Sequence, residues 1–240
     1  MYSPNMVTLP IKGQTEKYAV NPTKIIALGL NYDDHVQESV FLQAKGLAPD
    51  RPSEPILFPK TPNCLIGPDE EIIIPQFVYD YGFDDVRVDY EAELAVIIGK
   101  RGKNISQNNA WDYIFGYTCM NDVSQRNFQT TDKSGWFRGK SLDTFGPIGP
   151  CVVLKESIKD PQNLRIQCRL NGKTVQDSNT KFMIFSIPFT IAFVSKHFTL
   201  EEGDIIVTGT PKGVGPLKKG DLVEVEIQEI GTLSNSVNIV

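Results

Sequence analysis

The stretch "DYEAELAVIIGK", residues 89–100, constrains the fold most, because it is an apolar strand pattern that carries two acids. Side chains along a strand point alternately to opposite faces. Glu91 and Glu93 therefore share one face, while Ala92 and Leu94 lie on the other. Two carboxylates held side by side repel and raise each other's pKa. The pair predicts either a sheet face open to solvent or a cation between the two acids.

The rest of the chain predicts a single domain that is α+β and mainly β, with a few helices. An Asn-Gly pair at 171–172 lies between two alternating segments, which is a strong hairpin signal. Residues 31–46 and 186–200 predict helices, and the proline-rich residues 47–63 predict a loop around a short strand. Further segments predict a helix capped by Ser106 at 106–116, strands at 24–30, 70–75, 90–99 and 117–122, and strand and turn over 203–240.

Composition narrows the classes of partner. Of the 240 residues, 40% are hydrophobic and 22% are charged, and the net charge of −5 comes without a cluster of Lys and Arg. Phosphate binding needs such a cluster, so we exclude nucleic acid as a partner. No apolar run approaches the roughly 18 residues of a membrane span. The first residues lack a signal-peptide pattern and the cysteines form no C-x-x-C pair, so we predict no membrane contact and a cytoplasmic protein.

Asp122 is a third carboxylate that joins the two glutamates as a candidate. It closes the predicted strand "YTCMND", at a strand end where sites are commonly built. Oxygen ligands alone suit a hard ion such as Mg²⁺ or Mn²⁺, with Ca²⁺ as a substitute. The alternative is that Glu91 and Glu93 line a solvated face and Asp122 starts a turn.

The chain has two histidines, His35 and His197, so a histidine-based zinc site is nearly excluded. Glu38 follows His35 by three residues, which places both on one face of a helix. The carboxylate would hold the imidazole and raise its basicity, as general acid/base catalysis requires. The alternative is an ordinary exposed pair. His197 is interpreted as a surface residue near a helix end.

Two further segments are candidates for anion binding. Lys140 stands among glycines, aromatics and prolines, a setting suited to neutralising an enolate or a carboxylate. The segment "TGTPKGVG", residues 208–215, offers backbone N–H groups and hydroxyls that could cradle an anion. It lacks the spacing of a P-loop, and tight turns are often equally rich in glycine.

Six motifs in order resemble the fumarylacetoacetate hydrolase family. The resemblance covers residue 24 to the C-terminus and is closest to the short single-domain members. Those members include acylpyruvate hydrolases, oxaloacetate decarboxylases, and isomerases of homoprotocatechuate breakdown such as the 2-hydroxyhepta-2,4-diene-1,7-dioate isomerase type. The motifs are "GLNYDDHVQE", "DYEAELAVIIGK", "GYTCMNDVSQRNFQ", "WFRGKSLDTFGPIGP", "MIFSIP" and "LEEGDIIVTGTPKGVGP".

The resemblance implies a fold, a dimer and a role for each motif. The family fold is a mixed β-roll or distorted β-barrel, usually a homodimer, which here gives a lead at 1–23 and a catalytic domain at 24–240. The implied Mg²⁺ or Mn²⁺ ligands are Glu91, Glu93 and Asp122. The implied catalytic residues are His35 and Glu38, with Lys140, and the implied substrate contacts are Arg126, Gln129, Lys140 and Thr210.

The chain also departs from the family pattern. Asn127 stands where many members have aspartate, which predicts an altered contact to the preceding arginine. A separate N-terminal domain like that of fumarylacetoacetase is missing, which argues against fumarylacetoacetate as substrate. Residues 39–55, expected to form part of a lid, match no known specificity, and Arg51 within them is a candidate for binding a second carboxylate.

The expected function is metal-dependent chemistry on 2-oxo acids through a stabilised enolate. The first expectation is C–C hydrolysis of an acylpyruvate-type substrate, in which His35 and Glu38 activate water. The alternatives are isomerisation or decarboxylation of 2-hydroxymuconate-type diacids or oxaloacetate. A further alternative from another class is an inactive relative that binds a ligand without turning it over.

Overall fold

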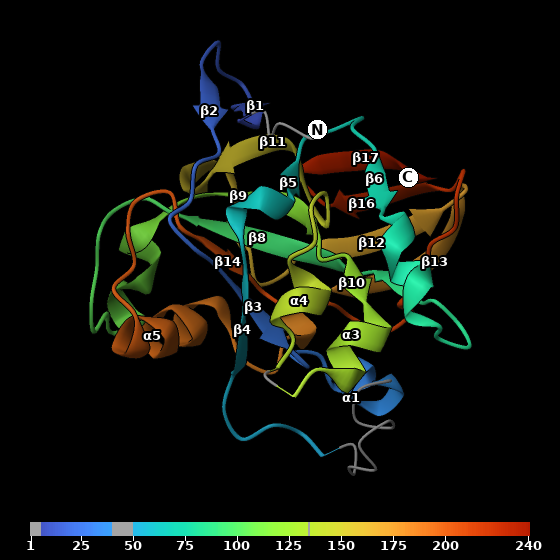
Figure 1. Cartoon of the computed structure of the whole chain (residues 1–240). Coiled ribbons are helices and arrows are strands. Elements are labelled where there is room, and N and C mark those ends of the chain that lie inside the picture. Colours follow the sequence, from blue (N-terminus) through green and yellow to red (C-terminus); the bar gives the residue numbers. More distant parts are fainter. Residues whose placement is uncertain (1–5, 40–49, 134) are drawn as a thin grey trace.

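A mixed seven-stranded sheet forms the centre of the computed structural model, which describes residues 6–39, 50–133 and 135–240 (Figure 1). β14 pairs in parallel with β3 on one side and antiparallel with β8 on the other. The strands in spatial order are β4 (Ile56–Lys60), β3 (Ile25–Gly29), β14 (Ile205–Val207), β8 (Ala92–Ile98), β9 (Ile114–Asn121), β11 (Gly146–Leu154) and β5 (Leu65–Ile66).

A five-stranded sheet packs beside the first, and smaller sheets flank both. Its strands in spatial order are β13 (Lys173–Asn179), β12 (Arg165–Leu170), β16 (Leu222–Ile227), β17 (Gly231–Ile239) and β6 (Ile72–Ile74). The smaller sheets are formed by β10 (Ser124–Gln125), β7 (Val88–Tyr90) and β15 (Gly215–Pro216), and by β1 (Thr8–Pro10) and β2 (Lys17–Ala19). The mainly-β prediction is confirmed, and the large sheet curls as a half-barrel.

Short helices surround the sheets (Figure 1). The α-helices are α1 (Asp33–Glu38), α3 (Arg126–Thr131), α4 (Phe137–Lys140) and α5 (Ile187–His197). The 3-10 helices are η1 (Pro62–Cys64), η2 (Gln76–Tyr81), η3 (Gln107–Tyr113), η4 (Lys155–Ser157) and η5 (Thr180–Phe182). Within the described residues, no helix is long and apolar enough to cross a membrane.

β8 is buried on both faces, and this decides where its acids can point. One face of β8 belongs to the core shared with the five-stranded sheet, through Ala92, Leu94, Val96 and Ile98. Ala95 and Ile97, at odd positions, belong to a second apolar cluster, which β1 covers with Leu9. Glu91 and Glu93 lie on the odd side, so the face that carries them is enclosed rather than solvated.

Several predicted elements are confirmed. Asn171 and Gly172 both adopt positive φ and join β12 to β13 as a hairpin. The helix predicted at 186–200 forms as α5, and Ser186 caps it by accepting a hydrogen bond from the Phe189 N–H. His197 is the last residue of α5 and is exposed.

Two predicted helices differ from the structure. The helix expected at 31–46 ends at Glu38, because Ser39 has extended ψ, and residues 40–49 lie outside the described part. The segment 106–116 forms the 3-10 helix η3, and Ser106 precedes it without a side-chain hydrogen bond. β9 then begins at Ile114, so pairing with the sheet ends that helix early.

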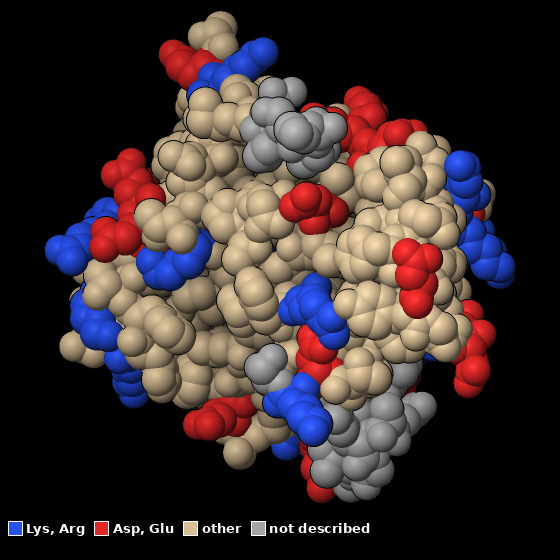
Figure 2. Space-filling model, viewed as in Figure 1, with Lys and Arg blue, Asp and Glu red and all other residues tan. Residues whose placement is uncertain are grey.

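The surface carries charges of both signs in small, separated groups on the face shown in Figure 2. The four cysteines hold free thiols, of which Cys151 is partly exposed and the other three are buried. The cytoplasmic location and the domain boundary at residue 24 stay predictions.

Candidate metal centre and active site

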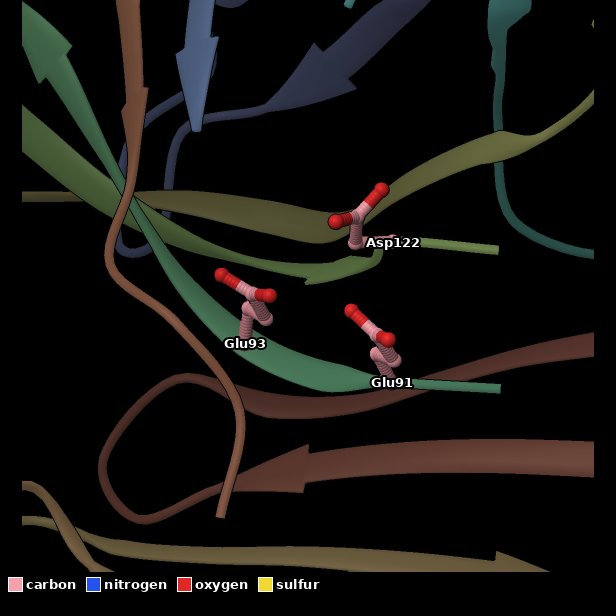
Figure 3. Close-up of side chains that lie close together, drawn as sticks. All are labelled: Glu91, Glu93 and Asp122. Atoms are coloured by element: carbon pink, nitrogen blue, oxygen red, sulfur yellow. The ribbon is translucent and has the colours of Figure 1, made fainter. Parts of the chain in front are cut away.

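Three carboxylates, Glu91, Glu93 and Asp122, converge at one end of the central sheet (Figure 3). Glu93 lies in β8, Glu91 immediately precedes that strand, and Asp122 follows the paired strand β9. The backbone N–H of Asp122 donates to the carbonyl of Glu91 at 2.9 Å, which holds the two chains in this register. One oxygen of each acid lies within 4.8 Å of the others, and all three side chains are buried. The solvated-face interpretation is therefore wrong.

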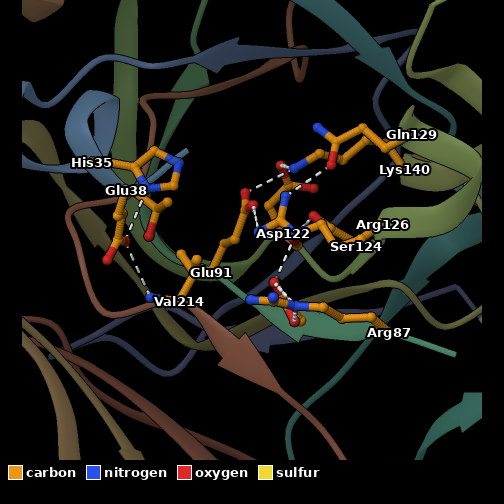
Figure 4. A network of polar contacts seen from close by, with 12 residues as sticks. His35, Glu38, Arg87, Glu91, Asp122, Ser124, Arg126, Gln129, Lys140 and Val214 are labelled. Atoms are coloured by element: carbon orange, nitrogen blue, oxygen red, sulfur yellow. Dashed lines mark hydrogen bonds and ion pairs between the residues drawn. The ribbon is translucent and has the colours of Figure 1, made fainter. Parts of the chain in front are cut away.

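Glu91 is neutralised by two cations (Figure 4). The Nζ atom of Lys140 lies 2.7 Å from its Oε2, and the Nη2 atom of Arg126 lies 2.6 Å from its Oε1. Burial opposes ionisation, but Lys140 and Arg126 outweigh it and hold the pKa of Glu91 well below its usual range. Glu91 is therefore a carboxylate at neutral pH.

Glu93 has the opposite electrostatic setting. Burial, with the charges of Asp122 and Glu91, raises the pKa of Glu93 well above its usual range. Its Oε2 accepts a hydrogen bond from the Gly209 N–H at 2.5 Å, and its buried Oε1 has no hydrogen-bond partner among the described residues. An unpaired carboxylate oxygen beside two other acids fits a divalent cation, and a ligand set of oxygens alone suits a hard one.

A buried lysine missed by sequence reasoning supports Asp122. Lys60 ends β4 and is 1% exposed, and its Nζ lies 2.7 Å from Asp122 Oδ1. The same Nζ donates to the carbonyl of Lys140, whose own Nζ lies 2.5 Å from Asp122 Oδ2. The lysine that ends the apolar strand "ILFPK" was the available signal.

Arg126 is anchored by another residue that sequence reasoning missed, Asp89. Its Nε lies 2.7 Å from the Asp89 carboxylate, and its Nη1 donates to Gln129 Oε1 at 2.8 Å. Asn127 instead accepts from the Arg87 N–H, so it does not take the place of an aspartate beside Arg126. Asp89 provides that acidic partner. We call Lys60, Asp89, Glu91, Glu93, Asp122, Arg126 and Lys140 the buried charge cluster.

A pocket lies beside the buried charge cluster, and His35 and Glu38 form a pair on the side of this pocket away from Arg126 and Lys140 (Figure 4). His35 Nδ1 lies 3.2 Å from Glu38 Oε1, and His35 is only 7% exposed, so the pair is not an ordinary surface contact. Burial opposes the ionisation of Glu38, but hydrogen bonds from His35 and the Gly213 N–H lower its pKa. An ionised Glu38 accepts a hydrogen bond from the imidazole and so holds its orientation.

The glycine-rich loop at 208–215 donates backbone hydrogen bonds to two of the chain's own carboxyl groups. The Gly209 N–H donates to Glu93, and the Gly213 N–H donates to Glu38 at 2.7 Å. Gly209 has φ +92°, and a Cβ there would lie 2.7 Å from the Cβ of Asn31. The loop therefore links a candidate metal ligand to the candidate acid/base pair.

One pocket brings most of the predicted site residues together. Glu38 and Asp122 are not in its wall, although each contacts a residue that is. Arg51 also lies outside the wall and pairs with Asp33 at the surface. The lining residues are Leu28, Gly29, Leu30, His35, Ser39, Phe58, Glu91, Glu93, Arg126, Gln129, Trp136, Lys140, Thr210 and Val214.

Comparison with known proteins places this site in a family. Residues 24–238 match the family described as fumarylacetoacetate (FAA) hydrolase, C-terminal. The mitochondrial oxaloacetate tautomerase of Xenopus laevis is 45% identical over 227 residues, which cover 90% of this chain and 66% of that protein.

Solved structures agree with the sequence comparison. The 5-carboxymethyl-2-hydroxymuconate delta-isomerase from Mycobacterium smegmatis is 35% identical with a TM-score of 0.78, covering 92% of this chain and 79% of that one. The fumarylpyruvate hydrolase from Pseudomonas aeruginosa, crystallised with Mn²⁺ and pyruvate, is 27% identical with a TM-score of 0.85, covering 100% and 99%. Fold, motifs and relatives agree, and the chain belongs to the fumarylacetoacetate hydrolase family.

Proposed function

We propose that this protein is a divalent-metal-dependent enzyme that moves a proton at the carbon beside the carbonyl of a small 2-oxo acid. The observation that carries this proposal is the pocket itself. It has the His35–Glu38 pair on one side and the buried charge cluster on the other. Such a site offers a base to one part of a substrate and positive charge to another.

Glu91, Glu93 and Asp122 are the residues that would hold Mg²⁺ or Mn²⁺. A bound dication would supply Lewis-acid polarisation of the 2-oxo group. The relative crystallised with Mn²⁺ and pyruvate supports this assignment. The unpaired Glu93 Oε1 supports it from within this chain.

The charge balance of the cluster favours an anionic substrate. With every group ionised, its four buried carboxylates and three buried cations leave one negative charge, before the partly exposed Arg87 beside Asp89 is counted. Burial, together with the charges of Asp122 and Glu91, raises the pKa of Glu93. A dication would change the balance to one positive charge, and a substrate carboxylate would neutralise it.

The chain's own residues have distinct tasks in this proposal. Glu38 holds Nδ1 of His35 and leaves Nε2 to exchange a proton with substrate or water. Lys140 and Arg126 stabilise the negative charge that develops on the 2-oxo oxygen. Gln129 and Thr210 orient the substrate from the pocket wall.

C–C hydrolysis of an acylpyruvate is the first reaction that this arrangement would support. His35 takes a proton from water, which adds to the distal carbonyl carbon. The C–C bond then breaks, and its electron pair stays on the carbon beside the 2-oxo group. Protonation of that carbon gives pyruvate, and the other product is a carboxylic acid.

Keto–enol tautomerisation of oxaloacetate is the second candidate. The 45% identity to an oxaloacetate tautomerase favours it. It needs a proton to leave carbon 3 and a proton to reach the 2-oxo oxygen, or the reverse, and it needs no water at the distal carbon. The same residues would serve, with His35 as the group that removes and returns the proton.

A panel of substrates with Mg²⁺ and with Mn²⁺ separates these reactions. Acetylpyruvate cleaved to acetate and pyruvate supports hydrolysis, and faster equilibration of oxaloacetate enol and keto forms supports tautomerisation. Release of CO₂ from oxaloacetate, or isomerisation of a hydroxymuconate diacid, identifies the remaining alternatives. A metal-loaded protein that turns over none of these compounds is a binding protein, which contradicts the proposal.

The homodimer and the catalytic domain at 24–240 are also proposals, which rest on the family resemblance. Analytical ultracentrifugation tests the dimer directly, because a sedimenting species of one chain's mass excludes it. Expression of residues 24–240 tests the boundary by whether that fragment unfolds cooperatively.

A further inference from the structure

Gln176 is a buried polar side chain that reaches the site from the other sheet. It lies in β13, at the edge of the five-stranded sheet, and is 1% exposed. Its Oε1 accepts a hydrogen bond from the Ala92 N–H at 3.0 Å. Its Nε2 donates to Thr210 Oγ1 and to the Pro211 carbonyl, each at 2.8 Å. The side chain thus joins β8 to the glycine-rich loop.

The orientation of this amide follows from its partners. Ala92 presents an N–H, so the oxygen of Gln176 must face it, and Pro211 presents a carbonyl, so the nitrogen must face that. The reversed amide would place two donors together at Ala92 and two acceptors together at Pro211. The Nε2 hydrogens therefore point to Thr210 and Pro211.

This orientation sets the polarity of the Thr210 hydroxyl. A hydroxyl has one proton to donate and two lone pairs to accept with. Thr210 Oγ1 accepts from Gln176, and no acceptor for its own proton lies among the described residues. Thr210 is 2% exposed and lines the pocket. Its proton is left for a ligand in the pocket.

Gln176 also contacts the backbone between two candidate metal ligands. Ala92 separates Glu91 from Glu93, and its N–H is held by Gln176. The far end of the glycine-rich loop packs on β13, the strand of Gln176, because a Cβ on Gly213 would lie 2.1 Å from the Val175 carbonyl oxygen. One strand of the second sheet therefore supports both the metal strand and the loop.

We propose that Gln176 is a positioning residue that makes the Thr210 hydroxyl a donor to the carboxylate of the bound 2-oxo acid. This inference rests on the proposed function, since it needs a 2-oxo acid in the pocket. Gln176 does not touch the substrate in this account. It acts by filling the acceptor side of Thr210 and so directing the proton of the hydroxyl into the pocket.

The test is a double-mutant cycle on Gln176→Met and Thr210→Val, read as pyruvate affinity of the Mn²⁺-loaded protein by calorimetry. Each single change should weaken pyruvate binding about 10- to 100-fold, as expected for a lost hydrogen bond to a charged group. The double variant should bind pyruvate less than about threefold more weakly than Thr210→Val alone, because the hydroxyl that Gln176 orients is already gone. Affinity for Mn²⁺ alone, measured in the same way, should change less than affinity for pyruvate.

A structural role for Gln176 predicts something else. If Gln176→Met acts by loosening the structure in general, it would weaken pyruvate binding by the same factor with and without Thr210→Val. It would also weaken Mn²⁺ binding by as much as pyruvate binding. That pair of results overturns the inference. Thr210→Ser and Thr210→Val test the proposal even where Gln176→Met does not fold. Serine should keep pyruvate affinity within about threefold of the unmodified protein and valine should not, because only the hydroxyl donates. Equal affinity of the valine variant and the unmodified protein overturns the inference.

The same binding experiment also tests the proposed function separately. If the unmodified, Mn²⁺-loaded protein binds neither pyruvate nor oxaloacetate, the proposed function fails and the inference fails with it. If the unmodified protein binds pyruvate and Gln176→Met binds it equally well, only the role of Gln176 is overturned.

Discussion

The same kinds of ion pair occur in two regions of this molecule, one buried and one exposed. On the five-stranded sheet Arg165 pairs with Asp177 at 2.6 Å, and Arg169 pairs with Glu224 and Glu226. We call these five residues the exposed arginine ladder, within which Arg169 and Glu224 are partly buried and Arg165 and Asp177 are about half exposed. In the buried charge cluster, the ion-pair distances are similar but the side chains are removed from water.

The two groups of ion pairs differ in the free energy that is lost when their charges leave water. Exposed pairs stay solvated, so neither their formation nor their loss changes stability much. Buried charges lose their hydration, and apolar residues of similar volume are often as stable or more stable in their place. The cluster contains more acids than bases and leaves Glu93 Oε1 unpaired, which stability alone does not explain. We infer that the buried cluster serves ligand binding, while the ladder serves the surface.

Glu93→Gln should have the largest effect. It removes an anionic oxygen that no other group satisfies, so Mn²⁺ binding should weaken at least about 100-fold, since even outer contacts of metal ligands contribute 10- to 100-fold. Turnover should be lost with the metal. Calorimetry measures the affinity, and Glu224→Gln in the ladder is the control that should bind Mn²⁺ as before.

His35→Ala should separate catalysis from metal binding. General acid/base catalysis contributes about 10²- to 10⁴-fold, so turnover should fall by that amount. Mn²⁺ affinity should stay unchanged, because His35 contacts Glu38 rather than the three carboxylates. Loss of Mn²⁺ binding in this variant would instead make His35 part of the metal site or of its support.

Lys60→Met should test the cost of the buried cluster itself. Removing one partner of a buried pair destabilises a protein by about 3–5 kcal/mol. Urea denaturation in EDTA should therefore show that the free energy of unfolding falls by an amount of that order. Lys24→Met is the matched control, because Asp204 keeps hydrogen bonds from Thr23 and two backbone N–H groups. Equal losses in the two variants would remove the distinction between the cluster and an ordinary pair.

Arg165→Ala in the ladder should have the smallest effect. Its side chain and that of Asp177 are about half exposed, and such surface changes shift the melting temperature by less than about 2 °C. Turnover should not change. A large fall in melting temperature would show that the exposed ladder contributes to stability after all.

Local sequence pattern predicted much of this site. Alternation along "DYEAELAVIIGK" placed Glu91 and Glu93 on one face, and helical spacing placed His35 beside Glu38. Position at a strand end singled out Asp122, and the surrounding glycines singled out Lys140 and the loop at 208–215; the ordered motifs then added Arg126. All of these lie in or directly beside one pocket.

The supporting residues could not be predicted in the same way. Lys60, Asp89 and Gln176 contact site residues that lie far from them along the chain. Whether the face of β8 that carries Glu93, Ala95 and Ile97 is enclosed depends on β1, which comes from near the start of the sequence, far from β8 along the chain. Local periodicity contains no information about such contacts, so it left the solvated face open as an alternative.

Hydrogen–deuterium exchange at the methyl group of pyruvate tests the central claim most directly. The exchange requires proton removal at the carbon beside the 2-oxo group, and NMR in D₂O with diamagnetic Mg²⁺ follows it. We predict exchange catalysed by the Mg²⁺-loaded protein and lost in EDTA, in Glu93→Gln and in His35→Ala. Exchange at an undiminished rate in EDTA, or none with Mg²⁺ and pyruvate both bound, would contradict the account.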